Sequence, residues 1–172
     1  ILKMHELSGQ DLKEISIDDF EKMQEEASQE KDAGTQVRYY PINEAAAKRA
    51  KEMNSFSDYT PGSATLEYKS LVDQAAEIAK NQKKRVDPSF HDKIDALLDT
   101  YSKKLAANMN NGFVIDARVP SVLIAGGSNF PTRKKEKQNA ARDKNYGEWK
   151  DIQGLLEKIR STGMGGISAD DP

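Results

Sequence analysis

The segment "RVDPSFHDKIDALLDTYSKKLAANMN", residues 85–110, decides the fold class. Its apolar residues recur every three or four positions, the period of one face of an α-helix. Asp87 is suited to the N-cap and Pro88 to the first helical position. Asn111 and Gly112 then provide a typical stop signal. The segment therefore predicts a helix of about five turns, whose buried face carries Phe90, Ile94, Leu97, Leu98, Tyr101, Leu105, Ala106 and Met109.

A second helix is predicted immediately before it, over residues 63–85. Its apolar residues again recur at three and four, and its last residues are positively charged, which the helix dipole favours. The connection "RVDPS" is so short that the two helices must form an antiparallel hairpin. The predicted buried face of this first helix carries Tyr68, Leu71, Val72, Ala75, Ile78 and Ala79.

Two further helices flank the hairpin. "YYPINEAAAKRAKEMNSF", residues 39–56, predicts an alanine-rich helix that opens at Pro41. A long last helix is predicted from about Pro131 to Thr162. Its first half has no large apolar residue, so we expect it to project from the body or lie on its surface. Its second half should pack on the hairpin through Trp149, Ile152, Leu156 and Ile159.

Charge divides the chain into parts. Residues 1–33 carry ten acidic and four basic side chains, whereas the whole chain has a net charge of −2. We expect residues 1–34 to be an acidic, partly ordered leader and residues 35–162 to be one helical domain. Residues 163–172 are interpreted as a glycine-rich linker or a truncated end, because the chain begins without Met and reads as a fragment. The predicted fold class is all-α: an elongated helical hairpin or bundle with a long C-terminal helix and a short irregular apolar elbow.

Composition argues against several functions. The chain has no cysteine, which excludes disulfides and thiolate chemistry and fits a cytoplasmic location. No apolar run is long enough to span a bilayer, so no membrane partner is expected. His91 lies near Asp95, but a solvated histidine is favoured over a metal ligand there. No catalytic serine motif appears. We therefore expect no enzyme activity, no cofactor and no metal.

The most distinctive segment is "VLIAGGSNFPTRKKEKQNAARDK", residues 122–144. It lacks the glycine spacing and the Gly-Lys-Ser/Thr end of a phosphate-binding loop. We interpret it instead as a structural elbow, with Val122, Leu123 and Ile124 buried as an anchor. Two glycines should supply unusual backbone angles, Ser128 or Asn129 should cap the next helix, and the aromatic ring should pack beside the turn. The elbow residues are Gly126, Gly127, Ser128, Asn129, Phe130 and Pro131.

Six basic residues follow the elbow in the helix predicted over residues 131–145. Two interpretations are open: a rod that contacts nucleic-acid phosphates, or a solvated lysine-rich helix face. Another four cations, Lys80, Lys83, Lys84 and Arg85, could add a second patch. The candidate nucleic-acid-binding residues are Arg133, Lys134, Lys135, Lys137, Arg142 and Lys144.

Four segments carry a resemblance: "YYPINEAAAKRAKEMNSFSDY", "RVDPSFHDKIDALLDTYSKKLAANMN", "ARVPSVLIAGGSNFPTRKKEKQNAARDK" and "IRSTGMGGISADDP". Together they resemble uncharacterised proteins, with a domain of unknown function, encoded on conjugative elements, plasmids and phages of anaerobic gut bacteria. The resemblance covers residues 37–172 and brings no catalytic residues with it. It implies an accessory role on a mobile element, near DNA transfer, maintenance or host defence.

Two function classes therefore remain open. The first is a non-catalytic accessory domain that associates with nucleic acid through residues 131–145. The second is a helical protein-interaction adaptor, which includes an inhibitor of a host defence complex. The partner and the oligomeric state stay open.

The predicted core face generates a first test. Replacing Leu98 by alanine should lower the free energy of unfolding by about 2–5 kcal/mol, because it removes buried methyl groups and leaves a cavity. Urea unfolding followed by far-UV circular dichroism measures this cost. A loss below about 0.5 kcal/mol would show that the face is not core.

Overall fold

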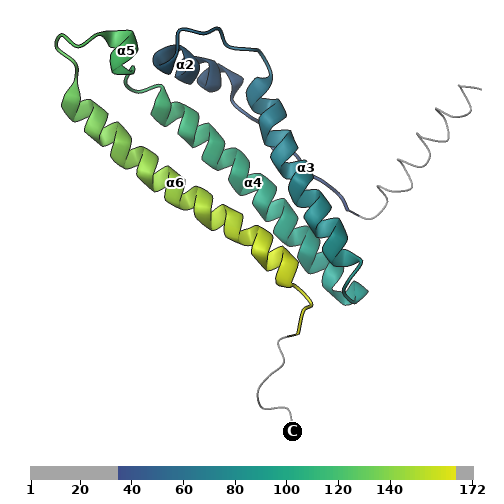
Figure 1. Cartoon of the computed structure of the whole chain (residues 1–172). Helices are drawn as coiled ribbons and strands as arrows, with labels where there is room; N and C mark the ends of the chain where they lie inside the picture. The colour runs from purple at the N-terminus through teal and green to yellow at the C-terminus, as the bar shows by residue number, and fades with distance from the viewer. Residues whose placement is uncertain (1–34, 166–172) are drawn as a thin grey trace, which may run out of the picture. The chain divides into compact units, whose positions relative to one another are not determined.

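The computed structural model describes residues 35–165 (Figure 1). The acidic leader predicted over residues 1–34 lies outside the described residues. Residues 35–165 belong to one compact unit. No strand occurs in the described range, so the all-α class is confirmed. The elements are α2 (Glu44–Asn54), α3 (Ser63–Lys83), the 3-10 turn η1 (Pro88–Phe90), α4 (His91–Asp116), α5 (Val122–Ala125) and α6 (Thr132–Ser161).

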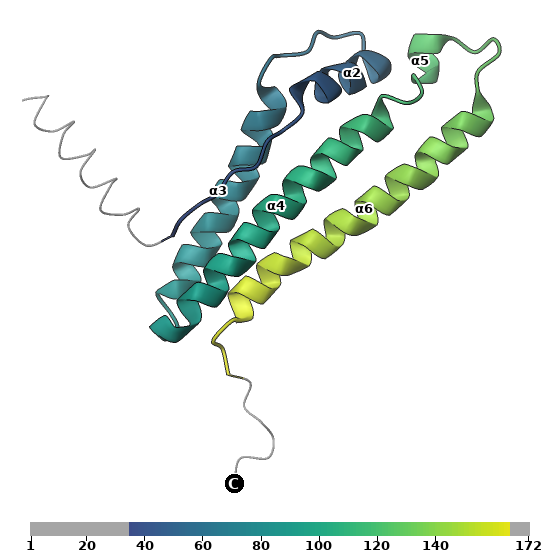
Figure 2. The same ribbon diagram turned by 180° about the vertical axis from the view of Figure 1, so that it is seen from behind.

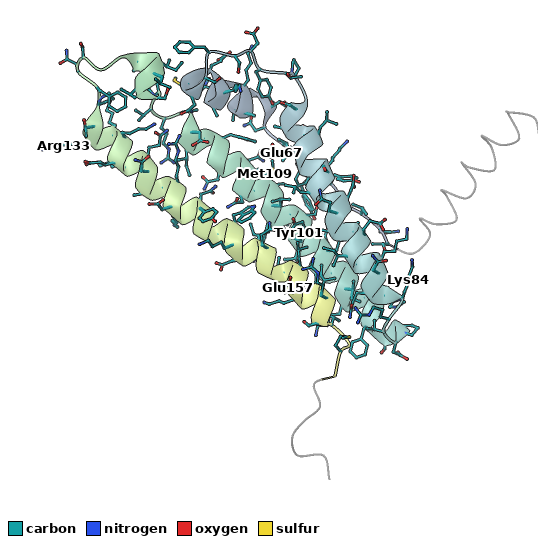
Figure 3. All side chains as sticks on the ribbon, in the orientation of Figure 1. Glu67, Lys84, Tyr101, Met109, Arg133 and Glu157 are labelled. Atoms are coloured by element: carbon teal, nitrogen blue, oxygen red, sulfur yellow. The ribbon has the colours of Figure 1, made fainter. Side chains whose placement is uncertain are left out.

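Helices α3, α4 and α6 run side by side with α4 in the middle (Figures 1 and 2). The predicted hairpin of α3 and α4 is confirmed, and its apolar faces form one core. Phe90, predicted on the buried face, instead lies in η1 and is exposed. Leu98 is 1% exposed, as predicted, and Tyr101, labelled in Figure 3, is buried beside it. The core is completed by Tyr68, Val72, Ala75 and Ala79 of α3, Ile94, Leu105 and Ala106 of α4, and Ile152, Leu155 and Ile159 of α6.

The packing face of α6 differs from the prediction at one residue. Ile152 and Ile159 are buried and Leu156 packs partly buried against the core, as expected. Trp149 is 37% exposed and is not in the core. Leu155 is buried instead. At about 100° per residue, Trp149 and Leu155 lie about 60° from Ile152 in opposite directions around α6, and the core lies on the Leu155 side.

Helix α4 runs past its predicted stop. It continues to Asp116, with Gly112 inside the helix. A Cβ at Gly112 would lie 3.1 Å from the side-chain nitrogen of Asn145 in α6. The glycine thus serves a close helix–helix approach, not a helix end. The same Asn145 accepts hydrogen bonds through its side-chain oxygen from Asn111 at 2.9 Å and from Asn108 at 3.2 Å.

Helix α2 begins later than predicted. Its N-cap is Asn43, whose side chain accepts the Ala46 N–H at 2.9 Å, so Pro41 lies two residues before the helix cap. Pro41 belongs to the segment 35–43, which is fastened to the hairpin. There the Tyr40 N–H donates to the Tyr68 hydroxyl at 2.9 Å, and the Tyr40 hydroxyl donates to Asp99 at 2.9 Å. The bond to the Asp99 carboxylate raises the pKa of Tyr40.

Helix α3 is capped by a residue of α2. Its own N-cap, Gly62, has no side chain to accept hydrogen bonds. The Glu44 carboxylate accepts the Thr65 N–H at 2.7 Å, the Thr65 hydroxyl at 2.5 Å and the Gly62 N–H at 3.1 Å. The Tyr59 hydroxyl donates to it as well. These hydrogen bonds favour the ionised form and lower the pKa of Glu44 to about 2.

This cap generates a pH-dependent prediction. Because the folded-state pKa of Glu44 lies below the ordinary 4.5, its contribution is complete above pH 4.5 and is lost as the pH falls toward 2. Glu44→Gln should therefore lower the urea midpoint at pH 7, and its difference from the parent protein should shrink at pH 3. Glu52→Gln, on an exposed i,i+4 pair, is the control and should change little. An equal Glu44→Gln deficit at both pH values would contradict the assignment.

Candidate nucleic-acid interface

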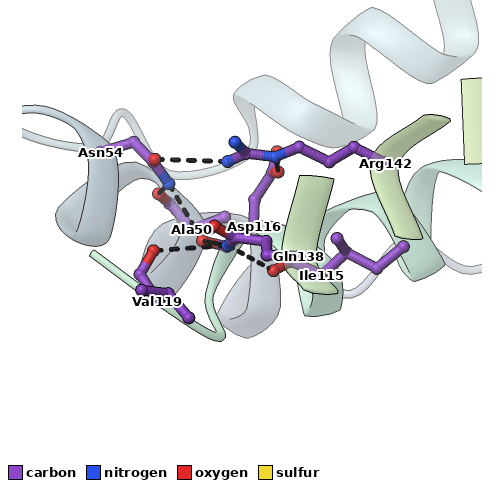
Figure 4. A network of polar contacts seen from close by, with 7 residues as sticks. All are labelled: Ala50, Asn54, Ile115, Asp116, Val119, Gln138 and Arg142. Carbon is purple, nitrogen blue, oxygen red and sulfur yellow. Dashed lines mark hydrogen bonds and ion pairs between the residues drawn. The ribbon is translucent and has the colours of Figure 1, made fainter. Parts of the chain in front are cut away.

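The first half of α6 is held against α4 by polar contacts (Figure 4). Gln138 is 1% exposed, and its side-chain NH₂ donates to the carbonyl oxygens of Ile115 at 2.7 Å and Val119 at 3.3 Å. These carbonyls lie at or just beyond the end of α4, where the helix itself supplies no partners. The first half of α6 was predicted either to project from the body or to lie on its surface. These contacts place it on the surface.

Arg142 takes part in the same junction. Its Nε donates to Asp116 Oδ1 at 2.6 Å, and a terminal nitrogen lies 3.4 Å from the side-chain oxygen of Asn54. Asn54 in turn donates to the carbonyl oxygens of Ala50 at 2.8 Å and Asp116 at 3.0 Å (Figure 4). Of the six predicted phosphate contacts, Arg142 is thus the one that joins α2, α4 and α6.

Lys135 lies on the same side of α6 as Arg142 and is half-buried. Burial is the main cause that lowers the pKa of Lys135, and the positive charge of Arg142 adds to it. The nearby Asp116 carboxylate acts in the opposite direction. Only part of the Lys135 side chain is therefore accessible to a ligand.

The other four cations are exposed: Arg133, Lys134, Lys137 and Lys144. None of them makes an ion pair with another residue in the range 35–165. Three of them lie in the first two turns of α6, and Figure 3 shows Arg133 at its very start. The first turn has no acidic residue. The positive end of the helix dipole therefore adds to these charges, at a cost in helix stability.

The apolar anchor of the elbow was predicted wrongly. Residues 122–125 form the single helical turn α5, in which Val122 is 51% and Leu123 is 77% exposed. The connection is anchored one turn earlier: Val119 is 4% exposed, and the Ser121 N–H donates to the Met53 carbonyl at 2.8 Å. Because the buried Val119 and the Ser121–Met53 backbone hydrogen bond already hold the connection, the α5 side chains do not need to be buried.

The elbow itself agrees with the prediction in part. Gly126 has φ +78°, as expected for a residue that only glycine adopts easily. Gly127 has no positive φ. The predicted side-chain cap is wrong, because the N-cap of α6 is Pro131 and no side chain of Ser128 or Asn129 bonds to the helix. Phe130 is half-buried, and its carbonyl accepts the Thr132 N–H at 2.8 Å.

The second predicted basic patch is largely neutralised. Lys83 is buried and pairs with Asp95 at 2.5 Å, and Lys80 pairs with Glu77 at 3.8 Å. Lys84 and Arg85 remain exposed. His91, weighed above as a metal ligand, has its Nε2 2.9 Å from the Lys83 carbonyl oxygen. Within the described range, no three His, Asp or Glu side chains gather closely enough to hold a metal ion.

An aromatic pair beside the basic segment was missed as a surface feature. Tyr146 is 56% exposed, and its ring stacks on Trp149 with centroids 5.7 Å apart and planes 11° apart. The Lys150 ammonium lies 4.6 Å from the Tyr146 ring centroid. Tyr146 and Trp149 border a cleft of about 410 Å³ between α4 and α6. Trp149 reads as a core residue in the helical period, which is why the sequence did not reveal the pair.

No family model, curated protein or solved structure matches the chain. None of the helices described here is both long and apolar enough to cross a membrane. The function therefore has to be inferred from the arrangement of α6 and its surroundings.

The elbow generates a paired prediction. Gly126→Ala should lower the free energy of unfolding by about 1 kcal/mol or more, because alanine at a positive φ is strained. Gly127→Ala is the matched control: a Cβ there meets nothing within 4 Å, so stability should be unchanged or slightly raised. Thermal melts of both variants measure this. Equal melting temperatures would contradict the assigned role of Gly126.

Proposed function

We propose that this chain is a non-catalytic domain that associates with nucleic acid, with Arg133, Lys134, Lys137 and Lys144 of α6 as its phosphate contacts. The observation that carries the proposal is the exposure of these four cations without an acidic partner in the described range. Residues 35–165 as a whole carry 22 basic and 16 acidic side chains, a net charge of +6. Neutralising phosphates and releasing their counterions would offset the repulsion among these cations.

The placement of the cluster supports this proposal over a solvated helix face. Lysines that serve only solubility are favoured near helix C-termini, where the dipole is negative. Here Arg133 and Lys134 lie at the positive end of α6, which has no side-chain cap. Gln138 and Arg142 tie the following turns to α4, so the cations are presented on a fixed helix. A fixed row of cations suits a regular phosphate backbone.

The wider role proposed is that of an accessory domain of a mobile genetic element, acting in the cytoplasm. Its support is the sequence resemblance of residues 37–172 to proteins encoded on conjugative elements, plasmids and phages. The absence of cysteine agrees with a reducing compartment.

A second candidate function, a protein-interaction adaptor or inhibitor of a host defence complex, is favoured by one observation. Phe56 is 81% exposed and Leu123 is 77% exposed. Phe56 and Ile124, the neighbour of Leu123, line one shallow hollow between α2 and α5. An exposed aromatic ring beside such a hollow could serve as the anchor of a protein interface. This surface would not need the cations of α6.

Fluorescence anisotropy across a salt series tests the first proposal. The double variant Lys134→Glu/Lys137→Glu should bind labelled single-stranded DNA, duplex DNA or RNA at least tenfold more weakly at low salt. Its log–log salt dependence should also be shallower, by roughly 0.7 per lost phosphate contact on a single strand. Circular dichroism and the melting temperature should be unchanged, because both side chains are exposed.

The control is Lys93→Glu/Lys103→Glu, which makes the same change in net charge on exposed positions of α4. It should weaken binding far less. An equal loss in both double variants would show that only net charge matters and would contradict the assigned contacts. If the parent protein binds none of the three nucleic acids at low salt, the adaptor is favoured.

A further inference from the structure

We propose that the nucleic acid this domain takes is single-stranded, and that an unpaired base stacks on the Tyr146–Trp149 pair of α6. The inference rests on the proposed function and adds the class of nucleic acid and a second set of contact residues. Aromatic faces bind bases only where the bases are not already stacked in a duplex, whereas phosphate contacts alone do not discriminate.

The pair has the geometry of a stacking surface. Its rings are nearly parallel, 11° apart, and their centroids are separated by 5.7 Å. Both rings are accessible, Tyr146 at 56% and Trp149 at 37%. Neither residue belongs to the hydrophobic core, and exposing two large rings side by side leaves apolar area in water. Covering them with a base would remove that area from water.

Polar and charged groups surround the rings. The Lys150 ammonium lies over the Tyr146 ring, 4.6 Å from its centroid, so a base that stacks on this face of Tyr146 has to displace it toward a neighbouring phosphate. The cleft next to the rings is lined on its α4 side by Asn108 and Asp116 and on its α6 side by Arg142 and Asn145. Amide and guanidinium groups are suited to hydrogen bonds with base edges. Asn108, Asn145 and Arg142 are already hydrogen-bonded within the junction of α4 and α6, so stacking on the rings carries the inference.

The rings share a flank of α6 with two of the six basic residues. Lys135, Arg142, Tyr146 and Trp149 follow one flank of α6 at helical spacing. Eleven residues separate Lys135 from Tyr146, which corresponds to about 16 Å along a helix. Arg133, Lys137 and Lys144 lie on the opposite side of α6, so a strand that contacts them has to cross the helix to reach the rings. Such an alternation of cations and aromatic rings is how proteins bind single strands with little sequence preference.

Trp149 is the only tryptophan of the chain, so its fluorescence reports on this site directly. Titration with a twelve-nucleotide thymidine strand should quench the fluorescence, and a uridine strand of equal length should do the same. A blunt duplex of twelve base pairs should quench much less at equal occupancy, with occupancy followed by anisotropy of a label on the nucleic acid.

A variant test accompanies the titration. Tyr146→Ala should weaken binding to the thymidine strand roughly five- to a hundredfold and leave duplex binding within about twofold. Phe56→Ala is the matched control, because it removes an aromatic ring that is 81% exposed and lies outside α6. It should leave affinity for the strand unchanged. Both variants should keep the circular dichroism spectrum of the parent protein.

The outcomes separate the two proposals. If strand and duplex bind equally well without quenching and Tyr146→Ala binds like the parent, the stacking inference is overturned while the proposed function stands. If neither strand nor duplex binds at low salt, the proposed function itself fails. If Phe56→Ala weakens strand binding as much as Tyr146→Ala does, the effect is not specific to the pair and the inference is likewise overturned.

Discussion

The close approach of α6 to α4 is the contact on which the rest of the structure depends. Along the first half of α6 the contact is polar. Gly112 leaves room for Asn145, and the side-chain NH₂ of the buried Gln138 donates to the Ile115 carbonyl near the end of α4. Along the second half of α6 the contact is apolar, because Ile152 and Ile159 pack in the core. A polar contact needs directional partners, so it determines the rotation of α6 about its axis. That rotation decides which side chains face solvent.

Two helix ends in this domain are stabilised from neighbouring helices. Glu44 of α2 accepts the free N–H groups at the start of α3, and Gln138 of α6 donates to the Ile115 carbonyl in the last turn of α4. Each cap therefore also joins two helices, which makes local helix formation dependent on tertiary contact. The start of α6 is the exception: it has no side-chain cap and carries Arg133 and Lys134 against its dipole. The proposed phosphate contacts would offset that cost in helix stability.

The two flanks of α6 offer different chemistry from one rigid element. One flank exposes Lys137 and Lys144, and the other carries the Tyr146–Trp149 pair beside a cleft. Arg142 has two roles. Its ion pair with Asp116 holds the helix in place, and its side chain also lines the cleft. A phosphate backbone needs the first kind of surface, and an unpaired base needs the second.

The sequence by itself determined the helices and the hairpin, because the apolar period of residues 63–85 and 85–110 depends only on local geometry. It also located the basic segment and the positive φ of Gly126. Tertiary structure decided what local patterns cannot express. The sequence predicts Gly112 as a helix stop, but in the structure it lies against Asn145 inside the helix. The sequence predicts Arg142 as a free cation, but in the structure it pairs with Asp116. The helical period predicts Trp149 in the core, but in the structure Leu155 is buried and Trp149 is exposed. The deciding partners of Gly112 and Arg142 lie on other helices, and the burial of Leu155 depends on which side of α6 faces the core, so only the folded chain decides these three positions.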